Sequence, residues 1–167
     1  MNIKFKGSDI RLVGDFPKIG DPAKNFKMAK SDLSNFTLDC AETRRIVMNV
    51  FPSLDTPTCA LSVRRFNKIA AEQKNTIVLC ISKDLPFAQF RFCIAENIKN
   101  AIVLSDCRCD SKFGTDYGIA ICNGALCGML ARSVFVIEPD RTISYAALSG
   151  EISKEPDYDS LIQFLLK

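Results

Sequence analysis

The chain has 167 residues, 47% of them hydrophobic and 25% charged, a composition that predicts one globular domain over residues 1–167. Its net charge of +3 comes from scattered Lys and Arg residues, so the sequence shows no basic cluster that would indicate nucleic-acid binding. No apolar run approaches the roughly 20 residues of a membrane span, and the first residues lack the apolar segment of a signal peptide. Together these features predict a cytoplasmic protein with no membrane partner.

The first half of the chain predicts a hairpin and then strands that alternate with helices. Apolar residues flank a polar turn at Gly7 within the hairpin of residues 1–13. Residues 14–25 predict a loop, and Leu33, Phe36 and Leu38 predict short strand pieces. The expected core strands are 46–51, 76–81 and 101–104. One helix begins near Cys59. A second follows Asp84, its expected N-cap, and carries Phe87, Phe90 and Ile94 on one apolar stripe.

The second half predicts fewer helices and an antiparallel pair of strands. A short helix over 111–117 ends at Gly118, and residues 119–129 are irregular. Residues 133–137 and 142–148 predict a hairpin, and Asp157 is the expected cap of a closing helix. The order of elements predicts an α/β protein with a mixed central sheet, helices on both of its faces and an N-terminal β-hairpin.

Two residue counts restrict the chemistry. The chain contains no histidine, which removes Cys-His and Ser-His pairs, histidine general bases and histidine metal ligands. It contains eight cysteines, at positions 40, 59, 80, 93, 107, 109, 122 and 127. The chain is longer and richer in core residues than most secreted disulfide scaffolds, so most of these thiols are expected to be free.

The segment Pro52-Ser53-Leu54-Asp55-Thr56-Pro57-Thr58-Cys59 joins a buried strand to a helix. It places Cys59 in the first helical turn, where unpaired N–H groups and the helix dipole favour a thiolate. Thr56 stands where a Cys-x-x-Cys dithiol motif has its first cysteine, so Cys59 has no local disulfide partner. From spacing alone, Cys59 is either a reactive nucleophile or a half-buried structural thiol.

Several separate motifs resemble the peroxiredoxins, and in particular their thiol peroxidase subfamily of atypical two-cysteine enzymes. Pro52-x-x-x-Thr56-x-x-Cys59 matches the peroxiredoxin signature Pro-x-x-x-Thr/Ser-x-x-Cys. The subfamily is also matched by Asp84-Leu85-Pro86-Phe87-Ala88-Gln89, by Leu104-Ser105-Asp106, by Leu130-Ala131-Arg132-Ser133-Val134-Phe135-Val136-Ile137 and by Glu155-Pro156-Asp157-Tyr158. The resemblance covers nearly the whole chain, and it implies a thioredoxin-like fold, a thiol-dependent peroxidase without a cofactor, and a homodimer.

The resemblance also implies a role for each matching residue. Cys59 would be the peroxidatic cysteine, whose thiolate attacks hydrogen peroxide or an organic hydroperoxide and becomes a sulfenic acid. Thr56 would orient the peroxide, Pro52 would shield the sulfur from water, and Arg132 would pair with the thiolate. Cys93 would be the resolving cysteine, which forms an intrachain disulfide that thioredoxin or a similar dithiol reductant opens. Without the resemblance, Cys93 is best interpreted as a core thiol.

The remaining cysteines leave a second function open. Cys107-Arg108-Cys109 and Cys122-x4-Cys127 could supply four thiolates to a metal, although these spacings are weak zinc signals and no metal site is predicted. The alternative to a peroxidase is therefore a non-catalytic redox sensor or metal-binding module on the same fold.

Overall fold

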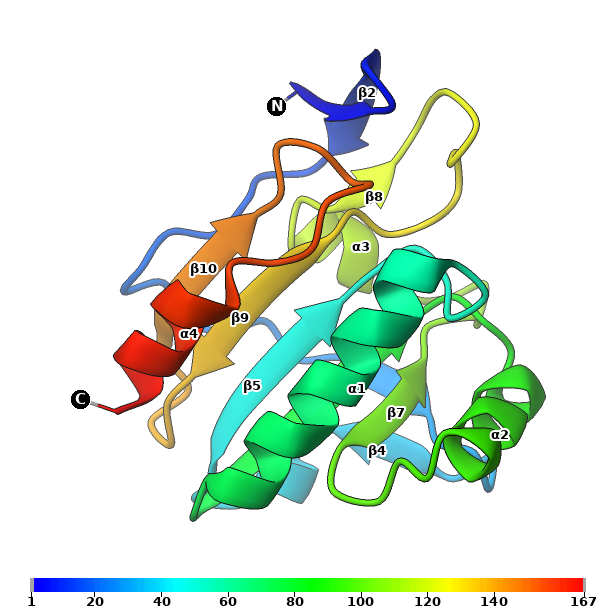
Figure 1. Ribbon diagram of the computed structural model, residues 1–167. Coiled ribbons are helices and arrows are strands. Elements are labelled where there is room, and N and C mark those ends of the chain that lie inside the picture. Colours follow the sequence, from blue (N-terminus) through cyan, green and yellow to red (C-terminus); the bar gives the residue numbers. More distant parts are fainter. Residues whose placement is uncertain (1, 167) are drawn as a thin grey trace.

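The computed structural model describes residues 2–166, and its centre is a seven-stranded mixed sheet (Figure 1). The strands are β3 Lys27–Ala29, β4 Asn35–Thr37, β5 Arg45–Val50, β6 Thr76–Ser82, β7 Ile102–Ser105, β9 Ser133–Ile137 and β10 Ile143–Leu148. They lie in the order β10-β9-β5-β6-β7-β3-β4. The strands β5, β6 and β7 are parallel, whereas β9 runs antiparallel to β5, which makes the sheet mixed as predicted.

A smaller sheet of three strands stands at one end of the molecule. It consists of β1 Asn2–Phe5, β2 Ser8–Val13 and β8 Ala120–Ile121, in the order β1-β2-β8. The predicted N-terminal hairpin is therefore confirmed for the described residues, while residue 1 lies outside them. Its turn is Lys6-Gly7, with φ angles of 50° and 83°. The expected irregular segment 119–129 contains β8, which pairs with β2.

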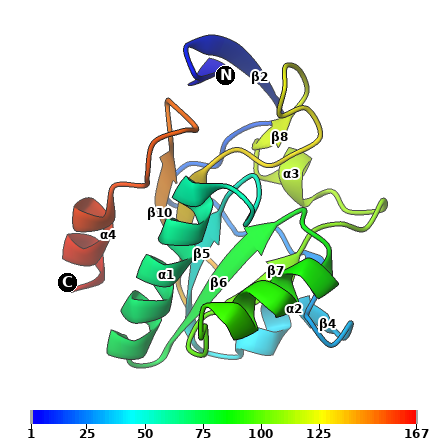
Figure 2. The same ribbon diagram turned by 45° about the vertical axis from the view of Figure 1, so that its right-hand side comes forward.

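Three helices cover one face of the large sheet, as the two views in Figures 1 and 2 show. These are α1 Pro57–Glu72, α2 Pro86–Ala95 and α4 Tyr158–Leu165, and the described residues also contain the short helix α3 Phe113–Asp116 and a 3-10 turn, η1 Leu38–Ala41. Side chains of α1 and α4 pack on one face together with Val47 of β5. Met48 of β5 points to the opposite face, where it joins a core that includes Phe113 of α3 and Ile10 of the hairpin. None of the helices within residues 2–166 is long and apolar enough to cross a bilayer.

The central strands explain why α1 begins where it does. Every residue of β5 from Ile46 to Val50 is buried, which is typical of a strand covered on both faces. Phe51 and Pro52 continue the buried run, and the chain then turns. Pro57 occupies the first helical position, where its fixed φ suits the helix and its missing N–H leaves no donor unpaired.

Two local predictions are wrong, one at the start of α2 and one in the segment 26–43. Leu85, not Asp84, is the N-cap of α2, because the Asp84 carboxylate is engaged elsewhere. The apolar stripe of α2 faces solvent: Phe87, Phe90 and Ile94 are 62%, 52% and 66% exposed. Side chains on the other face of α2, among them Gln89, contact the sheet.

The helix instead turns Gln89 inward, where its Nε2 donates to the carbonyl of Leu104 over 2.9 Å. In the segment 26–43, Phe36 lies in a strand as predicted. Leu33 lies in an exposed turn and Leu38 begins η1, so neither forms the predicted strand piece. The predicted hairpin of residues 133–148 and the Asp157 cap of the last helix are both present, with Asp157 accepting from Ser160 N over 3.0 Å.

Candidate active site

Cys59 lies in the first turn of α1, at the third helical position, and has no exposed surface (0%). It packs beside Phe51 and Val63 in the core between α1 and the sheet. Cys59 is nevertheless one of the residues that line a cavity of about 230 Å³. Any small molecule that meets this sulfur must therefore approach through the cavity rather than from open solvent.

Arg132 brings a guanidinium to the same sulfur from the segment before β9. Its Nη2 donates to Cys59 Sγ over 3.2 Å, and its Nε donates to the carbonyl of Ile152 over 2.9 Å. The side chain is only 2% exposed, and its Nη1 is buried without a hydrogen-bond partner among the described residues. A buried, unpaired donor is costly, so Nη1 is available to bind an oxygen that enters the cavity.

Thr56 and Pro52 complete the cavity wall next to Cys59. Thr56 is the N-cap residue of α1, yet its hydroxyl donates to the carbonyl of Ser53 over 3.1 Å instead of capping the helix. The hydroxyl oxygen keeps lone pairs that can accept a hydrogen bond from a bound molecule. Pro52 is buried and adds apolar surface. The structure thus brings together Cys59, Thr56, Arg132 and Pro52, four of the five residues singled out from the sequence.

Asp84 is a structural anchor that sequence reasoning assigned to a helix cap. Its carboxylate accepts from Ser53 Oγ, Leu54 N and Ser82 Oγ, each over 2.7 Å. It therefore ties the loop before Cys59 to the end of β6. Because α2 begins two residues after Asp84, the same carboxylate also fixes the start of the helix that carries Cys93.

Glu151 anchors the other side of the cavity, and no sequence pattern indicated it. Its Oε1 accepts from Lys6 N over 3.1 Å and from Ser153 N over 3.0 Å, and its Oε2 accepts from Gly7 N over 3.3 Å. These bonds, led by those from Ser153, lower the pKa of Glu151 to about 2. Lys6 and Ser153 both line the cavity, so Glu151 joins the N-terminal hairpin to the loop after β10 at its rim.

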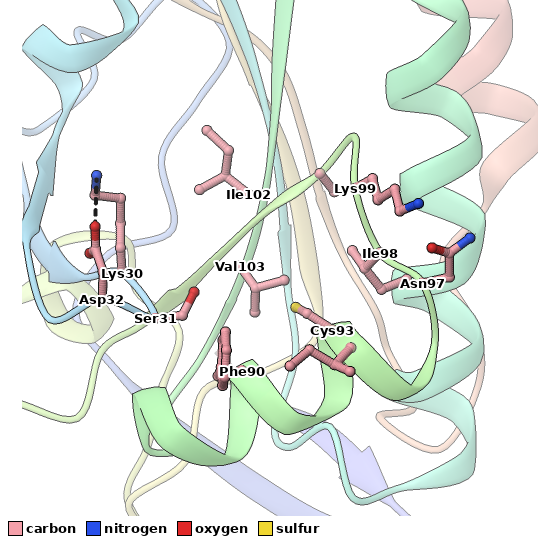
Figure 3. Close-up of a pocket in the computed structure, with 12 residues that line it drawn as sticks. Lys30, Ser31, Asp32, Phe90, Cys93, Asn97, Ile98, Lys99, Ile102 and Val103 are labelled. Carbon is pink, nitrogen blue, oxygen red and sulfur yellow. Dashed lines mark ion pairs between the residues drawn. The ribbon is translucent and has the colours of Figure 1, made fainter.

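Cys93, the fifth residue, lies apart from the other four. It is half-buried on α2 and lines a different cavity of about 820 Å³, which shares no lining residue with the cavity of Cys59. In Figure 3 its sulfur points from α2 toward Val103. Burial raises the pKa of the Cys93 thiol. Cys59 and Cys93 are both free thiols in this structure.

The remaining thiols are not gathered into a metal site. Within residues 2–166, no group of three or more Cys, Asp or Glu side chains is placed to hold a metal ion. Cys80 is buried in β6, which raises the pKa of its thiol to about 12. Cys40, Cys109, Cys122 and Cys127 are exposed, and Cys107 is partly exposed.

Comparison with known sequences gives the class of protein. The sequence matches the family described as Redoxin over residues 18–162, and the chain belongs to that family. It is 45% identical to a thiol peroxidase of Corynebacterium glutamicum, over 96% of each chain. It is 43% identical to a thiol peroxidase of Mycobacterium tuberculosis, over 98% of this chain and 97% of that protein. The resemblance to the thiol peroxidase subfamily of peroxiredoxins is thereby confirmed, and so is the expectation of a peroxiredoxin-type oxidoreductase.

Solved structures agree with the predicted α/β, thioredoxin-like fold. A peroxiredoxin-like protein from Aquifex aeolicus superimposes with a TM-score of 0.93 and 38% identity, over 99% of this chain and 95% of that one. A thiol peroxidase from Chromobacterium violaceum gives a TM-score of 0.90 over 99% and 96% of the two chains. Its 18% identity adds support for the fold alone.

Proposed function

We propose that this protein reduces hydrogen peroxide or organic hydroperoxides at Cys59. The supporting observation is the 3.2 Å hydrogen bond from Arg132 Nη2 to Cys59 Sγ in a cavity that also contains the Thr56 hydroxyl. A cation next to sulfur stabilises the thiolate, which is the nucleophilic form. The buried Nη1 of Arg132 is a second donor, and it suits the peroxide oxygen on which negative charge develops.

The reaction follows from these contacts. The thiolate of Cys59 attacks one oxygen of the peroxide, and the O–O bond breaks as the S–O bond forms. Cys59 becomes a sulfenic acid, and the second oxygen leaves as water or an alcohol after taking up a proton. The hydroxyl oxygen of Thr56 accepts a hydrogen bond from the peroxide O–H and so orients the peroxide for attack. Pro52 limits the access of water.

The test is a coupled assay with peroxide, thioredoxin, thioredoxin reductase and NADPH. We expect NADPH consumption that depends on peroxide and is lost in Cys59→Ser. Cys80→Ser is a matched control, because Cys80 is also a buried thiol but lies on β6 outside the cavity. Absence of Cys59-dependent peroxide consumption would contradict the proposal and favour a non-catalytic redox sensor on this fold.

We further propose that Cys93 resolves the sulfenic acid. Cys93 is half-buried on α2 and packs against the same core cluster as Cys59, although the two line separate cavities, so the disulfide would form through a rearrangement of the two helices. The Cys93 thiolate would attack the Cys59 sulfur, the S–O bond would break, and the leaving hydroxide would take up a proton to become water as the intrachain disulfide forms. Peptide mapping after one equivalent of peroxide should show Cys59 bonded to Cys93, and a different partner for Cys59 would overturn this assignment.

A dithiol protein such as thioredoxin is the proposed reductant, in a reducing cytoplasm. Leu85, Phe87, Phe90 and Ile94 form an exposed apolar surface on α2, the helix that carries Cys93. Apolar residues exposed together are typical of protein interaction sites, which supports either reductant docking or the proposed homodimer. Light scattering on the wild type and on Phe87→Ser distinguishes dimerisation through this surface from reductant docking. A monomeric wild type would exclude the homodimer.

A further inference from the structure

The loop of residues 122–127 begins and ends with a cysteine, and the proposed peroxidase cycle uses neither one. Gly128 N donates to the carbonyl of Ile121 over 2.9 Å, and Ile121 N donates to the carbonyl of Met129 over 3.0 Å. Gly128 has a φ of 87°, the conformation of the glycine in a bulge that closes a hairpin. Cys122 and Cys127 are the next residues inside this closure.

Facing residues of an antiparallel pair have Cα atoms about 4.5–5.5 Å apart. A disulfide needs a Cα separation of about 4.4–6.8 Å, so the ends of this loop suit one without a large backbone movement. Both thiols are free and exposed. In the sequence, Cys122 and Cys127 supply two of the four thiolates of a weak metal-binding pattern. Their position at the two ends of the loop favours a dithiol pair instead.

The loop also lies at the cavity of Cys59. Leu126, the residue before Cys127, is one of the cavity-lining residues. The start of the loop is tied to the N-terminal hairpin, since Cys122 N donates to the carbonyl of Arg11 over 3.0 Å and Asn123 Oδ1 accepts from Arg11 N over 2.7 Å. In Figure 1 this yellow segment follows β8, close to β2.

We propose that Cys122 and Cys127 form a second redox-active pair, which returns oxidised Cys59 to its thiolate independently of Cys93. The inference rests on the proposed function, because peroxide attack at Cys59 supplies the oxidant. Cys127 directly follows the cavity-lining Leu126, whereas Cys40, Cys107 and Cys109 have no chain neighbour among the lining residues.

The proposed sequence has two exchange steps. Cys127 attacks the sulfur of the Cys59 sulfenic acid, so the S–O bond breaks, a Cys59–Cys127 disulfide forms and water leaves with the thiol proton. The Cys122 thiolate then attacks Cys127, a Cys122–Cys127 disulfide forms and Cys59 leaves as a thiolate. In total, the thiols of Cys122 and Cys127 lose two electrons. The peroxide gains them and becomes water and an alcohol, or two waters.

The test uses Cys93→Ser, treated with one equivalent of hydrogen peroxide, alkylated and digested with trypsin. Cys122 and Cys127 share the tryptic peptide 113–132, whereas Cys59 lies in 46–64. We expect most copies of peptide 113–132 to carry no alkyl group and to be two hydrogens lighter than the unalkylated dithiol peptide. Cys59 should return to a thiol that the reagent alkylates. Cys93→Ser combined with Cys122→Ser should instead trap a Cys59–Cys127 disulfide that joins the two peptides.

Cys93→Ser combined with Cys107→Ser and Cys109→Ser is the matched control, and it should still form the Cys122–Cys127 disulfide. The inference is overturned if Cys59 in Cys93→Ser stays a sulfenic acid, captured by dimedone, while Cys122 and Cys127 remain fully alkylatable. The wild-type protein separates this failure from a failure of the proposed function. If peroxide leaves Cys59 unoxidised there, the proposed peroxidase function itself is wrong, and this inference is wrong with it.

Discussion

Arg132 donates a hydrogen bond to the sulfur of Cys59 over 3.2 Å, across 73 positions of the chain. Two backbone contacts hold this pair in place: Arg132 Nε is bonded to the Ile152 carbonyl, and Cys59 is fixed by the first turn of α1. The guanidinium is therefore preorganised, and it needs no further ordering when a peroxide enters.

Replacing Arg132 with Lys should lower the rate of Cys59 oxidation by roughly 10- to 100-fold. Lys keeps the charge but cannot bond the Ile152 carbonyl, the Cys59 sulfur and a substrate at once, and hydrogen bonds to charged groups contribute about 1.5–3 kcal/mol each. Stopped-flow measurement of single-turnover peroxide reduction gives the rate. Arg44→Lys, outside the cavity, is the matched control, and an equal loss in both variants would contradict a specific role for Arg132.

Thr56→Val should slow the same step by roughly two- to tenfold, whereas Thr56→Ser should retain most of the rate. Val removes the hydroxyl that donates to Ser53 and lines the cavity, and one neutral hydrogen bond contributes about 0.5–1.5 kcal/mol. The rates with hydrogen peroxide and with a bulky organic hydroperoxide measure the effect. If Val and Ser behave alike, the hydroxyl takes no part in orienting the substrate.

Asp84→Asn should destabilise the protein by about 1–3 kcal/mol and slow peroxide reduction. The carboxylate accepts three hydrogen bonds, and an amide would direct two donors at groups that already donate. Urea unfolding measures the free energy, and Asp55→Asn on the same loop is the control, because the Asp55 side chain is exposed. A normal stability for Asp84→Asn would show that the loop does not depend on this anchor.

The rate at which the Cys59–Cys93 disulfide forms should rise with pH between about 7 and 9. Burial raises the pKa of Cys93, so only a minor fraction of this thiol is ionised at neutral pH and each rise in pH increases the attacking thiolate. Double-mixing experiments, with peroxide first and a pH jump second, isolate this step. A flat profile would mean that unwinding of the helices, rather than ionisation of Cys93, limits the rate.

Glu151→Gln should remove part of the acid sensitivity of folding. The pKa of Glu151 is about 2 in the folded protein and 4.5 for an ordinary Glu, so its contribution is fully present above about pH 5. That contribution disappears as the pH falls from 4.5 toward 2. Unfolding free energies at pH 3 and pH 6 should therefore differ less in Glu151→Gln than in the wild type, while Glu72→Gln on the exposed face of α1 should resemble the wild type.

The sequence predicts well the features that depend on local patterns. The apolar runs at 46–51 and 76–81 become β5 and β6, and the Pro-rich turn before Cys59 places this residue in the first turn of α1. Burial of both faces and the special φ of proline act over a few residues, so they can be seen in the sequence.

Long-range relationships needed the structure. The bond between Glu151 and the hairpin turn spans about 145 residues, and nothing near Glu151 in the sequence indicates it. The direction of the apolar stripe of α2 needed the structure for a different reason. Helical spacing shows that Phe87, Phe90 and Ile94 share a face, but not whether that face meets the sheet or the solvent.

Where Cys93 is the resolving residue, the separate cavities of Cys59 and Cys93 set the lifetime of the oxidised intermediate. Each turnover must include a rearrangement before the two sulfurs meet, and the sulfenic acid persists for as long as that rearrangement takes. During this interval a second peroxide competes for the same sulfur and converts it to a sulfinic acid, which thiols do not reduce. The enzyme is therefore expected to turn over steadily at low peroxide and to inactivate itself once peroxide arrives faster than a resolving thiol reaches Cys59.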